Sequence, residues 1–287
     1  MYKILEKKIL ARDIKQFTIK APEVATYCKA GQFIILRINE KGERIPLTIY
    51  DFFFEKGTID IIFQEVGRTT YELGKMEQGE SLLDFVGPLG VPFEQEIELN
   101  KIKKVICVGG GLGVAPIYPK IKFLKEKGVE VISIIGARSK NLVILEQEVK
   151  NISNELYVCT DDGTYGEKGF VTQVLKRLLD NEAKPDLVVA IGPIPMMKAS
   201  SKVTELYQIK TLVSLNSIMV DGTGMCGSCR VSVGGKTKFT CSDGPTFDGH
   251  LVDFDELQMR QGRFLEEEKI AFEKYEGRCE CKCKCQI

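Results

Sequence analysis

The chain has little histidine, no excess of charge and no long apolar run. One histidine, His250, among 287 residues excludes a multi-histidine metal site, and its place near a loop predicts a surface side chain. Forty basic and forty acidic residues cancel, so no bulk positive field attracts nucleic acid or an anionic membrane. No apolar run approaches bilayer length, and the first residues carry charges where a signal peptide needs an apolar core. We therefore expect a cytoplasmic protein that binds neither nucleic acid nor membrane.

The composition is that of a globular protein, and its ten cysteines are unevenly placed. With 44% hydrophobic and 28% charged residues, the chain has room for two or three domains. Cys107 and Cys159 lie in apolar strand patterns and are expected to be small buried side chains. Four more cysteines alternate between residues 279 and 285. They could bind a soft metal from one strand face, but we favour a mobile thiol-rich tail.

The strongest pattern lies between residues 221 and 241, where Asp221 is followed by Cys226, Cys229 and Cys241. With cysteine in place of Asp221, this would be the C-x4-C-x2-C and distant C spacing of plant-type [2Fe–2S] clusters. Glycines at 222, 224 and 227 can take positive φ and let the backbone approach the inorganic core. The four residues are therefore candidate cluster ligands. A structural zinc site is the alternative, less favoured because the chain has a single C-x2-C pair.

Residues 1–97 contain short alternating or apolar segments separated by glycine, proline and asparagine, which predict a small antiparallel barrel or sandwich. The segments are 3–10, 17–20, 32–38, 58–63 and 81–86. Arg68, Thr69 and Thr70 open a short helical pattern that runs to Lys75. Free amides, hydroxyls and a guanidinium group at a helix start are suited to a pyrophosphate.

Residues 98–215 alternate between strand and helix patterns, which predicts a parallel sheet with helices on both faces. Strands are expected at 105–108, 129–135, 156–159, 187–191 and 211–214. Helices are expected after the glycine-rich run 109–116, ending at about 127, and at 141–150, 169–180 and 196–207. The first strand is followed by Gly109, Gly110, Gly111 and Gly113, at the end of the sheet where nucleotides bind. The motif from Gly111 to Pro116 is G-x-G-x-x-P, weaker than the full dinucleotide fingerprint.

Arg138 and Lys140 follow the second of these strands. A base at this point favours the extra phosphate of NADP, and the alternative is a solvated pair that begins the next helix. In residues 216–287, a hairpin is expected to turn at residues 234–235 and bring Cys241 back toward the cysteine loop. One amphipathic helix is expected from 254 to 275.

These residues resemble the ferredoxin-NADP reductase superfamily over nearly the whole chain. The resemblance rests on residues 42–48 (Gly-Glu-Arg-Ile-Pro-Leu-Thr), 87–90, 219–230 and 241–247. It lies in the branch with the electron-transfer subunit of dihydroorotate dehydrogenase, and is strongest to the small subunits of NADH-dependent reduced ferredoxin:NADP oxidoreductases. Cysteine is the first cluster ligand in the dihydroorotate branch, so Asp221 favours the latter group.

The resemblance implies three domains: an FAD-binding barrel (1–97), a nucleotide-binding α/β domain (98–215) and a [2Fe–2S] domain (216–287). The residues it places on the flavin are Pro46, Leu47, Thr48, Ile62, Phe63 and Gln64, with the Thr48 hydroxyl near N5, and Thr69 and Thr70 on the pyrophosphate. The residues it places on the nicotinamide nucleotide are 109–113 with Gly192, Pro193, Met196 and Met197. Two departures stand out: Ile45 takes the place of a flavin-binding arginine, and Ile191 that of a cysteine near the nicotinamide.

The expected function is electron transfer between a nicotinamide nucleotide, FAD and the cluster. The resemblance implies NAD(H), against the NADP suggested by Arg138. It also implies a larger partner subunit with a second FAD and [4Fe–4S] clusters, and exchange with ferredoxin through the complex. A dihydroorotate dehydrogenase subunit is one alternative, and a zinc-stabilised binding module that is not an enzyme is another.

Overall fold

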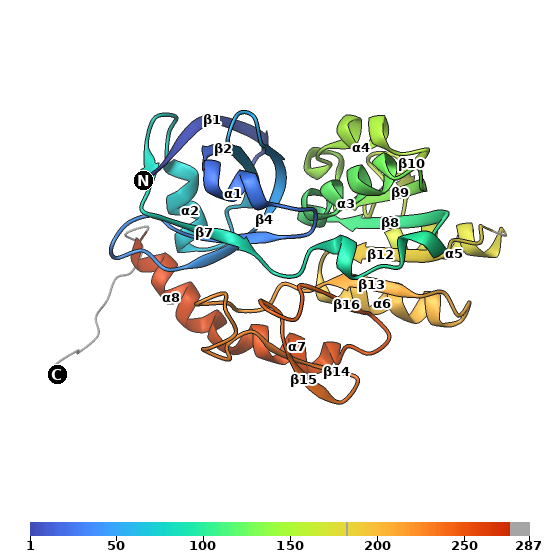
Figure 1. The fold of residues 1–287 in the computed structure, drawn as a ribbon. Helices are drawn as coiled ribbons and strands as arrows, with labels where there is room; N and C mark the ends of the chain where they lie inside the picture. Colours follow the sequence, from blue (N-terminus) through green and yellow to red (C-terminus); the bar gives the residue numbers. More distant parts are fainter. Residues whose placement is uncertain (182, 276–287) are drawn as a thin grey trace.

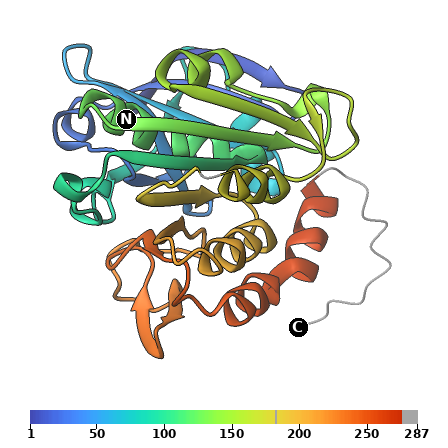
Figure 2. The same cartoon turned by 90° about the vertical axis from the view of Figure 1, so that its right-hand side faces the viewer.

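A computed structural model describes residues 1–181 and 183–275. Two seven-stranded sheets lie side by side, and the C-terminal hairpin and helices lie beneath them (Figures 1 and 2). The cysteines predicted to form a tail, between 279 and 285, lie outside the described residues. No helix within the described part of the chain is both long and apolar enough to cross a membrane.

The first sheet is the predicted antiparallel barrel, and this prediction is confirmed. Its strand order is β6-β1-β2-β5-β4-β3-β7, and buried side chains such as Phe17, Ile61 and Phe63 fill its interior. The strands are β1 (Tyr2–Ala11), β2 (Ile14–Lys20), β3 (Phe33–Arg37), β4 (Ile45–Phe53), β5 (Thr58–Gln64), β6 (Ser81–Leu82) and β7 (Asp84–Leu89), and the helices are α1 (Pro22–Tyr27) and α2 (Arg68–Lys75). The sequence patterns did not predict β4, whose second residue is Pro46.

The second sheet is the predicted nucleotide-binding type. Its order is β11-β10-β9-β8-β12-β13-β16, with β8 to β13 parallel and β16 antiparallel to β13. The strands are β8 (Lys104–Gly110), β9 (Glu130–Ala137), β10 (Glu155–Thr160), β11 (Glu167–Lys168), β12 (Leu187–Ile191), β13 (Thr211–Ser214) and β16 (Thr246–Asp248). The chain changes direction across the sheet between β8 and β12, which is where ligands bind in open α/β sheets.

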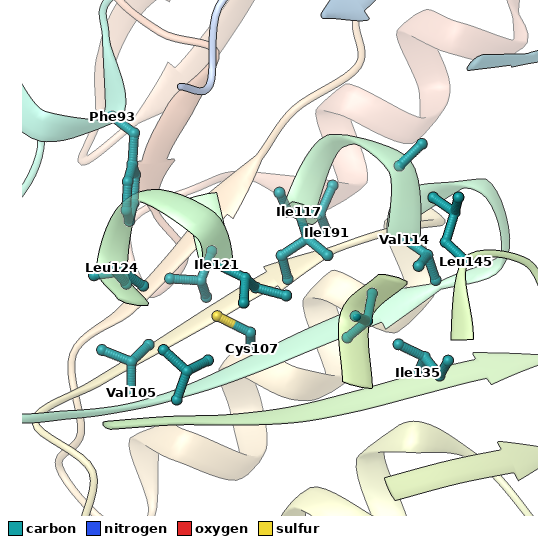
Figure 3. Packing of buried hydrophobic residues seen from close by; sticks show 14 of the residues in the cluster. Phe93, Val105, Cys107, Val114, Ile117, Ile121, Leu124, Ile135, Leu145 and Ile191 are labelled. Carbon is teal, nitrogen blue, oxygen red and sulfur yellow. The ribbon is translucent and has the colours of Figure 1, made fainter. Parts of the chain in front are cut away.

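Helices cover both faces of the second sheet, as the alternating sequence pattern predicts. Helices α3 (Val114–Glu126) and α4 (Glu146–Ile152) pack on one face, and α5 (Val171–Asp180) and α6 (Ile194–Glu205) on the other. Figure 3 shows Leu124 and Ile121 of α3 above Val105 and Cys107 of β8, and Ile117 beside Ile191. Cys107 and Cys159 are each 1% exposed, so the prediction that they are buried is confirmed. Short 3₁₀ turns are η1 (Phe93–Gln95), η2 (Leu99–Lys101), η3 (Gly111–Gly113) and η4 (Lys140–Leu142).

The C-terminal part begins with the predicted hairpin of β14 (Arg230–Val233) and β15 (Lys236–Phe239). The prediction of a single helix over 254–275 is wrong. It is divided into α7 (Phe254–Gln261), the 3₁₀ turn η5 (Gly262–Phe264) and α8 (Leu265–Tyr275), because glycine at 262 weakens the helix and lets the chain change direction. Helix α8 then reaches back to the barrel, where Tyr71 of α2 meets Phe272 edge-on at 5.5 Å.

One buried lysine joins the three parts of the molecule. Lys120 of α3 is 0% exposed, and its Nζ donates a hydrogen bond to Thr246 Oγ1 of β16 at 2.8 Å. The same Nζ lies 4.9 Å from the ring centroid of Phe93, in the segment after the barrel. Burial lowers the pKa of Lys120 to about 7. Nothing in the sequence distinguishes this lysine from the others on α3.

The lone histidine is less exposed than the sequence suggests. The His250 side chain is 22% exposed, and its Nε2 lies 3.0 Å from the hydroxyl of Thr204 on α6. The prediction of an ordinary surface side chain is therefore corrected to one that helps to pack the β16 loop on α6.

Candidate functional site

The predicted flavin residues lie on two neighbouring barrel strands. Alternation along β4 directs Ile45 and Leu47 toward the barrel core and Pro46 and Thr48 outward. Tyr50 continues this outer face, and its ring lies 4.8 Å from that of Tyr118 of α3, tilted by 35°. The outer face of β4 therefore borders the nucleotide-binding sheet.

On β5 the same alternation separates the three predicted residues. Ile62 belongs to the cluster of side chains shared with the second sheet, and Gln64 is half-buried. Phe63 is 0% exposed and packs edge-on against Phe17 inside the barrel, with ring centroids 5.1 Å apart. Only the backbone of Phe63 is left for contact with a ligand outside the barrel.

The predicted pyrophosphate segment starts α2. Gly67 is the N-cap in extended conformation, and Thr70 Oγ1 accepts hydrogen bonds from the backbone N–H groups of Val66 and Gly67 at 3.0 and 3.1 Å. Thr69 Oγ1 donates to a Glu43 carboxylate oxygen at 2.5 Å. Arg68 is turned toward α8, with its guanidinium carbon 5.9 Å from the Tyr275 ring centroid.

Helix α8 lines one side of a cavity next to this segment at the start of α2, which the sequence did not predict. Arg68 shares a cavity of about 500 Å³ with residues of α8, namely Glu267, Ile270, Ala271, Lys274 and Tyr275. In the sequence, Tyr275 near the end of a charged helix does not by itself indicate a ligand site. It lies near Arg68 because the bend at η5 directs α8 back to the barrel.

The structure brings together the glycine loop after β8 and the segment after β12. A Cβ on Gly113 would lie 2.1 Å from the carbonyl oxygen of Ile191, and one on Gly110 would lie 2.3 Å from Met196 Sδ. Gly111 has φ +56°, the left-handed region that favours glycine. Gly113 approaches backbone and Gly111 has a positive φ, so these two positions require glycine. The loop places Gly109, Gly192 and Pro193 at the carboxyl ends of adjacent strands.

Arg138 lies at the same edge of the sheet, directly after β9. It is exposed, and Gly136 of β9 is the register partner of Gly110. Lys140 points elsewhere, with its Nζ 5.4 Å from the ring centroid of Tyr165. Of the two basic residues, Arg138 is the one beside the glycine loop.

The four candidate cluster ligands form two pairs. Cys229 Sγ lies 3.1 Å from Cys241 Sγ, and both side chains are buried. The Asp221 carboxylate accepts a hydrogen bond from the backbone N–H of Cys226 at 2.9 Å and one from that of Thr223 at 3.0 Å. Within residues 1–181 and 183–275, no three His, Cys, Asp or Glu side chains converge closely enough to hold a single metal ion.

The charges of these groups differ with their surroundings. Burial raises the pKa of the Cys241 thiol to about 12, and the neighbouring Cys229 adds to the effect. Hydrogen bonding with Ser228 lowers the pKa of Cys226, and the Thr223 N–H lowers that of Asp221. A bound metal would convert the buried thiols to thiolates, because coordination deprotonates a thiol.

The backbone of this loop fits a compact inorganic group. Gly222, Gly224 and Gly227 have φ of 80°, 86° and 68°, which side chains rarely adopt. A Cβ on Gly222 would lie 2.7 Å from Ile35 Cδ1 of β3, and Cys229 and Cys241 pack with Phe33 and Ile35. The loop is therefore seated on the barrel strand β3.

The register of β3 and β4 relates this loop to the predicted flavin face. Ile35 is opposite Pro46, and Phe33 is opposite Thr48. Residues directly opposite one another in an antiparallel pair point to the same side, and neighbouring strands are about 5 Å apart. The cysteine loop and Thr48 therefore lie on one outer face of the barrel.

Comparison with known proteins agrees with this arrangement. Residues 216–253 match the model of the iron-sulfur cluster binding domain of dihydroorotate dehydrogenase B. A Thermotoga maritima protein described as a dihydroorotate dehydrogenase B (NAD(+)), electron transfer subunit homolog is 46% identical over 272 residues, which are 95% of this chain and 94% of that protein. The chain belongs to the family of dihydroorotate dehydrogenase B electron-transfer subunits and their homologues.

Solved structures extend the comparison within and beyond this family. The structure of an NADH-dependent reduced ferredoxin-NADP oxidoreductase superposes with a TM-score of 0.89 at 44% identity, over 96% of this chain and 98% of that one. A ferredoxin NADP+ reductase from Neisseria gonorrhoeae shares the fold, with a TM-score of 0.60 at 19% identity over 71% of this chain and 89% of the other. The resemblance predicted from the sequence, the fold class and the assignment as an electron-transfer oxidoreductase subunit are confirmed.

Proposed function

We propose that this chain is the small subunit of an oxidoreductase that couples NADH, NADP and ferredoxin, and that it passes electrons between NAD(H), FAD and a [2Fe–2S] cluster. The observation that supports it most strongly is the common outer face of Thr48 and the cysteine loop, established by the β3–β4 register. A flavin on β4 would lie within one or two strands of the cluster ligands, close enough for direct electron transfer.

The flavin would lie along the outward side chains Pro46 and Thr48, with Leu47 contributing its backbone. Ile62 and Gln64 would continue the wall on β5, and Arg68, Thr69 and Thr70 would hold the pyrophosphate at the start of α2. Bound FAD would supply the chemistry that joins a two-electron nicotinamide to one-electron carriers. Thr48 would place its hydroxyl at the flavin N5 and so orient the reacting atom.

The departure at Ile45 fits this placement. Ile45 packs toward the barrel core, and Arg44 is exposed one residue before β4. Neither offers a guanidinium group from within the strand. The phosphates would therefore depend more on α2, where Arg68 is the available base.

The cluster would be held by Asp221, Cys226, Cys229 and Cys241. A [2Fe–2S] cluster with four protein ligands takes two at each iron, and the structure has two pairs. A tetrahedral zinc ion needs its ligands around one point, so the paired arrangement favours the cluster. Asp221 is a harder ligand than thiolate and is expected to raise the reduction potential.

The nicotinamide nucleotide would bind across the β8 and β12 ends, on Gly109, Gly110, Gly111 and Gly113 with Gly192, Pro193 and Met196. We assign NAD(H), following the family. Arg138 beside the loop keeps NADP(H) as the alternative. Rates of reduction of the isolated protein by NADH and by NADPH distinguish the two.

A larger partner subunit with its own flavin and [4Fe–4S] clusters would complete the enzyme, and ferredoxin would react through that complex. A subunit of dihydroorotate dehydrogenase is the second candidate, favoured by the names of relatives, whereas Asp221 favours the first. The identity of the large subunit that copurifies decides between them. The cytoplasmic location and the division at 97/98 and 215/216 stay part of this proposal, with β16 of the third region paired to β13 of the second.

The test is metal, flavin and visible-spectrum analysis of the anaerobically purified protein and two cysteine variants. Cys229→Ser is expected to lose iron and the cluster absorption while it keeps FAD. Cys107→Ser changes a cysteine that is equally buried, at 1% exposed, but far from the loop, and is expected to keep both. A colourless wild-type protein with zinc instead of iron would refute the proposal.

A further inference from the structure

A small basic pocket lies beside the cysteine loop. It has a volume of about 160 Å³ and is lined by Ser217, Cys226, Arg230, Arg260 and Arg263, among others. Its walls come from the segment before the loop, from β14 and from the α7–η5 bend. The region that matches the iron-sulfur family model ends at residue 253, so Arg260 and Arg263 lie outside it.

The three guanidinium groups are gathered without a matching set of carboxylates. Arg230 Nη1 donates to the carbonyl oxygen of Gly227 at 3.0 Å, and Arg260 Nη2 to that of Ser228 at 3.3 Å. None of the three forms a salt bridge within the described residues. The negative charge of Glu256 offsets part of the repulsion that Arg260 has with Arg230 and Arg263. The arrangement therefore carries a repulsion that a bound negative charge would relieve.

A buried hydroxyl in the same pocket also has no partner. Ser217 is 6% exposed, and in the described part of the chain its Oγ makes no hydrogen bond. Buried polar groups in folded proteins are nearly always hydrogen-bonded. The Ser217 hydroxyl is a donor in a pocket whose other polar groups are mainly guanidinium donors, so both observations indicate an acceptor as the missing group.

We propose that this pocket binds an oxyanion, namely a carboxylate or phosphate group. Guanidinium groups present paired N–H donors that match the oxygens of either group. The volume is below the range for whole cofactors and drug-sized ligands, so the pocket accommodates one such group rather than a nucleotide. Ile218, Leu257 and Phe264 supply apolar walls.

The oxyanion has two possible sources, because the pocket opens beside the exposed Cys226. It is either a free anion or a carboxylate side chain of the partner subunit docked over the cysteine loop. The second source rests on the proposed function. The first does not, because it needs only Ser217 and the three arginines, none of which is a proposed flavin or iron ligand.

The first measurement is calorimetric titration of the anaerobically purified chain with inorganic phosphate at constant ionic strength. Wild type is expected to bind one equivalent, and Arg263→Gln and Arg260→Gln to weaken binding about tenfold, because each removes a charge-assisted hydrogen bond. Arg12→Gln is the control, since Arg12 is 92% exposed at a distant turn. Arg263 is itself exposed, so its variant is expected to fold, which melting temperature checks.

The second measurement repeats the titration on the assembled complex and compares assembly of the variants. Phosphate binding that persists in the complex identifies a free anion. Phosphate binding that disappears on assembly, or assembly that Arg263→Gln weakens and Arg12→Gln does not, identifies a carboxylate of the partner. The proposal is overturned if phosphate binding is absent or unaffected by both pocket variants and assembly is equally unaffected. A colourless protein that binds phosphate would refute the proposed function and leave this site in place.

Discussion

Replacement of Lys120 by methionine tests how the three parts of the molecule are joined. The side chain is fully buried between α3, β16 and Phe93, and methionine has nearly its length without the charge. The substitution removes the hydrogen bond to Thr246 and leaves that hydroxyl without its partner. It also removes a group whose charged form is unfavourable in the folded protein.

The magnitude follows from the separation of the two pKa values. Burial lowers the pKa of Lys120 from 10.5 to about 7, and at 1.36 kcal/mol per pH unit this separation corresponds to roughly 5 kcal/mol. Between these pH values the unfolded chain binds a proton that the folded chain does not, so stability rises with pH. The folded protein has these roughly 5 kcal/mol of stability in full above pH 10.5 and loses them as the pH falls to about 7. Loss of the Thr246 hydrogen bond costs about 1 kcal/mol at any pH.

Lys120→Met is therefore expected to be more stable than wild type near pH 7, and to lose this advantage as the pH approaches 10. Melting temperatures of both proteins, measured anaerobically from pH 6 to 10, give the difference directly. At about 2 °C per kcal/mol for a chain of this size, several degrees separate the two ends of the range. Only the difference between the proteins is used, because other groups titrate in both.

Lys125→Met is the matched control, since Lys125 is an exposed lysine on the same helix. Its melting temperature is expected to follow that of wild type at every pH. A constant difference between Lys120→Met and wild type across the range would refute the reasoning. It would mean that Lys120 keeps the same protonation state throughout, despite its burial.

Three further predictions concern the candidate sites. Gly113→Ala is expected to abolish nucleotide binding and lower the melting temperature, because its Cβ would lie 2.1 Å from the Ile191 carbonyl oxygen; NADH titration and thermal melting measure both. Asp221→Cys is expected to keep the cluster and lower its reduction potential, since thiolate donates more electron density to iron; spectroelectrochemistry measures it. Tyr275→Ala is expected to release FAD several times faster, because Tyr275 and Arg68 border one cavity; flavin fluorescence after dilution measures it.

Two of these have a control variant, and each has a contradicting result. Gly262→Ala, where the added Cβ meets nothing closer than 3.9 Å, should bind NADH normally, and equal binding by Gly113→Ala would contradict the close-packed loop. An unchanged potential in Asp221→Cys would show that Asp221 is not a ligand. Tyr27→Ala is the control for Tyr275→Ala, because it removes a tyrosine that is 73% exposed. Equal rates of flavin loss from the two variants would contradict the idea that α8 helps to retain FAD.

Local patterns in the sequence predicted most of the strands and helices and the cysteine loop. Strand and helix periods predicted the barrel and the parallel sheet, because burial of one face imposes a period on each element. The hairpin at Gly234 and Gly235 was predicted from turn chemistry. Strand β4 was missed, because Pro46 interrupts its pattern and Asp51 occupies one of its buried positions.

The sequence by itself determined which chemistry the chain carries: four ligand types at cluster spacing, and glycines where a backbone must come close to another group. Only the tertiary structure decided what these features face. It seated the cysteine loop on β3 beside Thr48, buried Lys120 between three segments, and gathered Arg230, Arg260 and Arg263 into one pocket. Spacing along the chain records what the local backbone requires, whereas these contacts join residues far apart in sequence and exist only once the sheets and helices have packed.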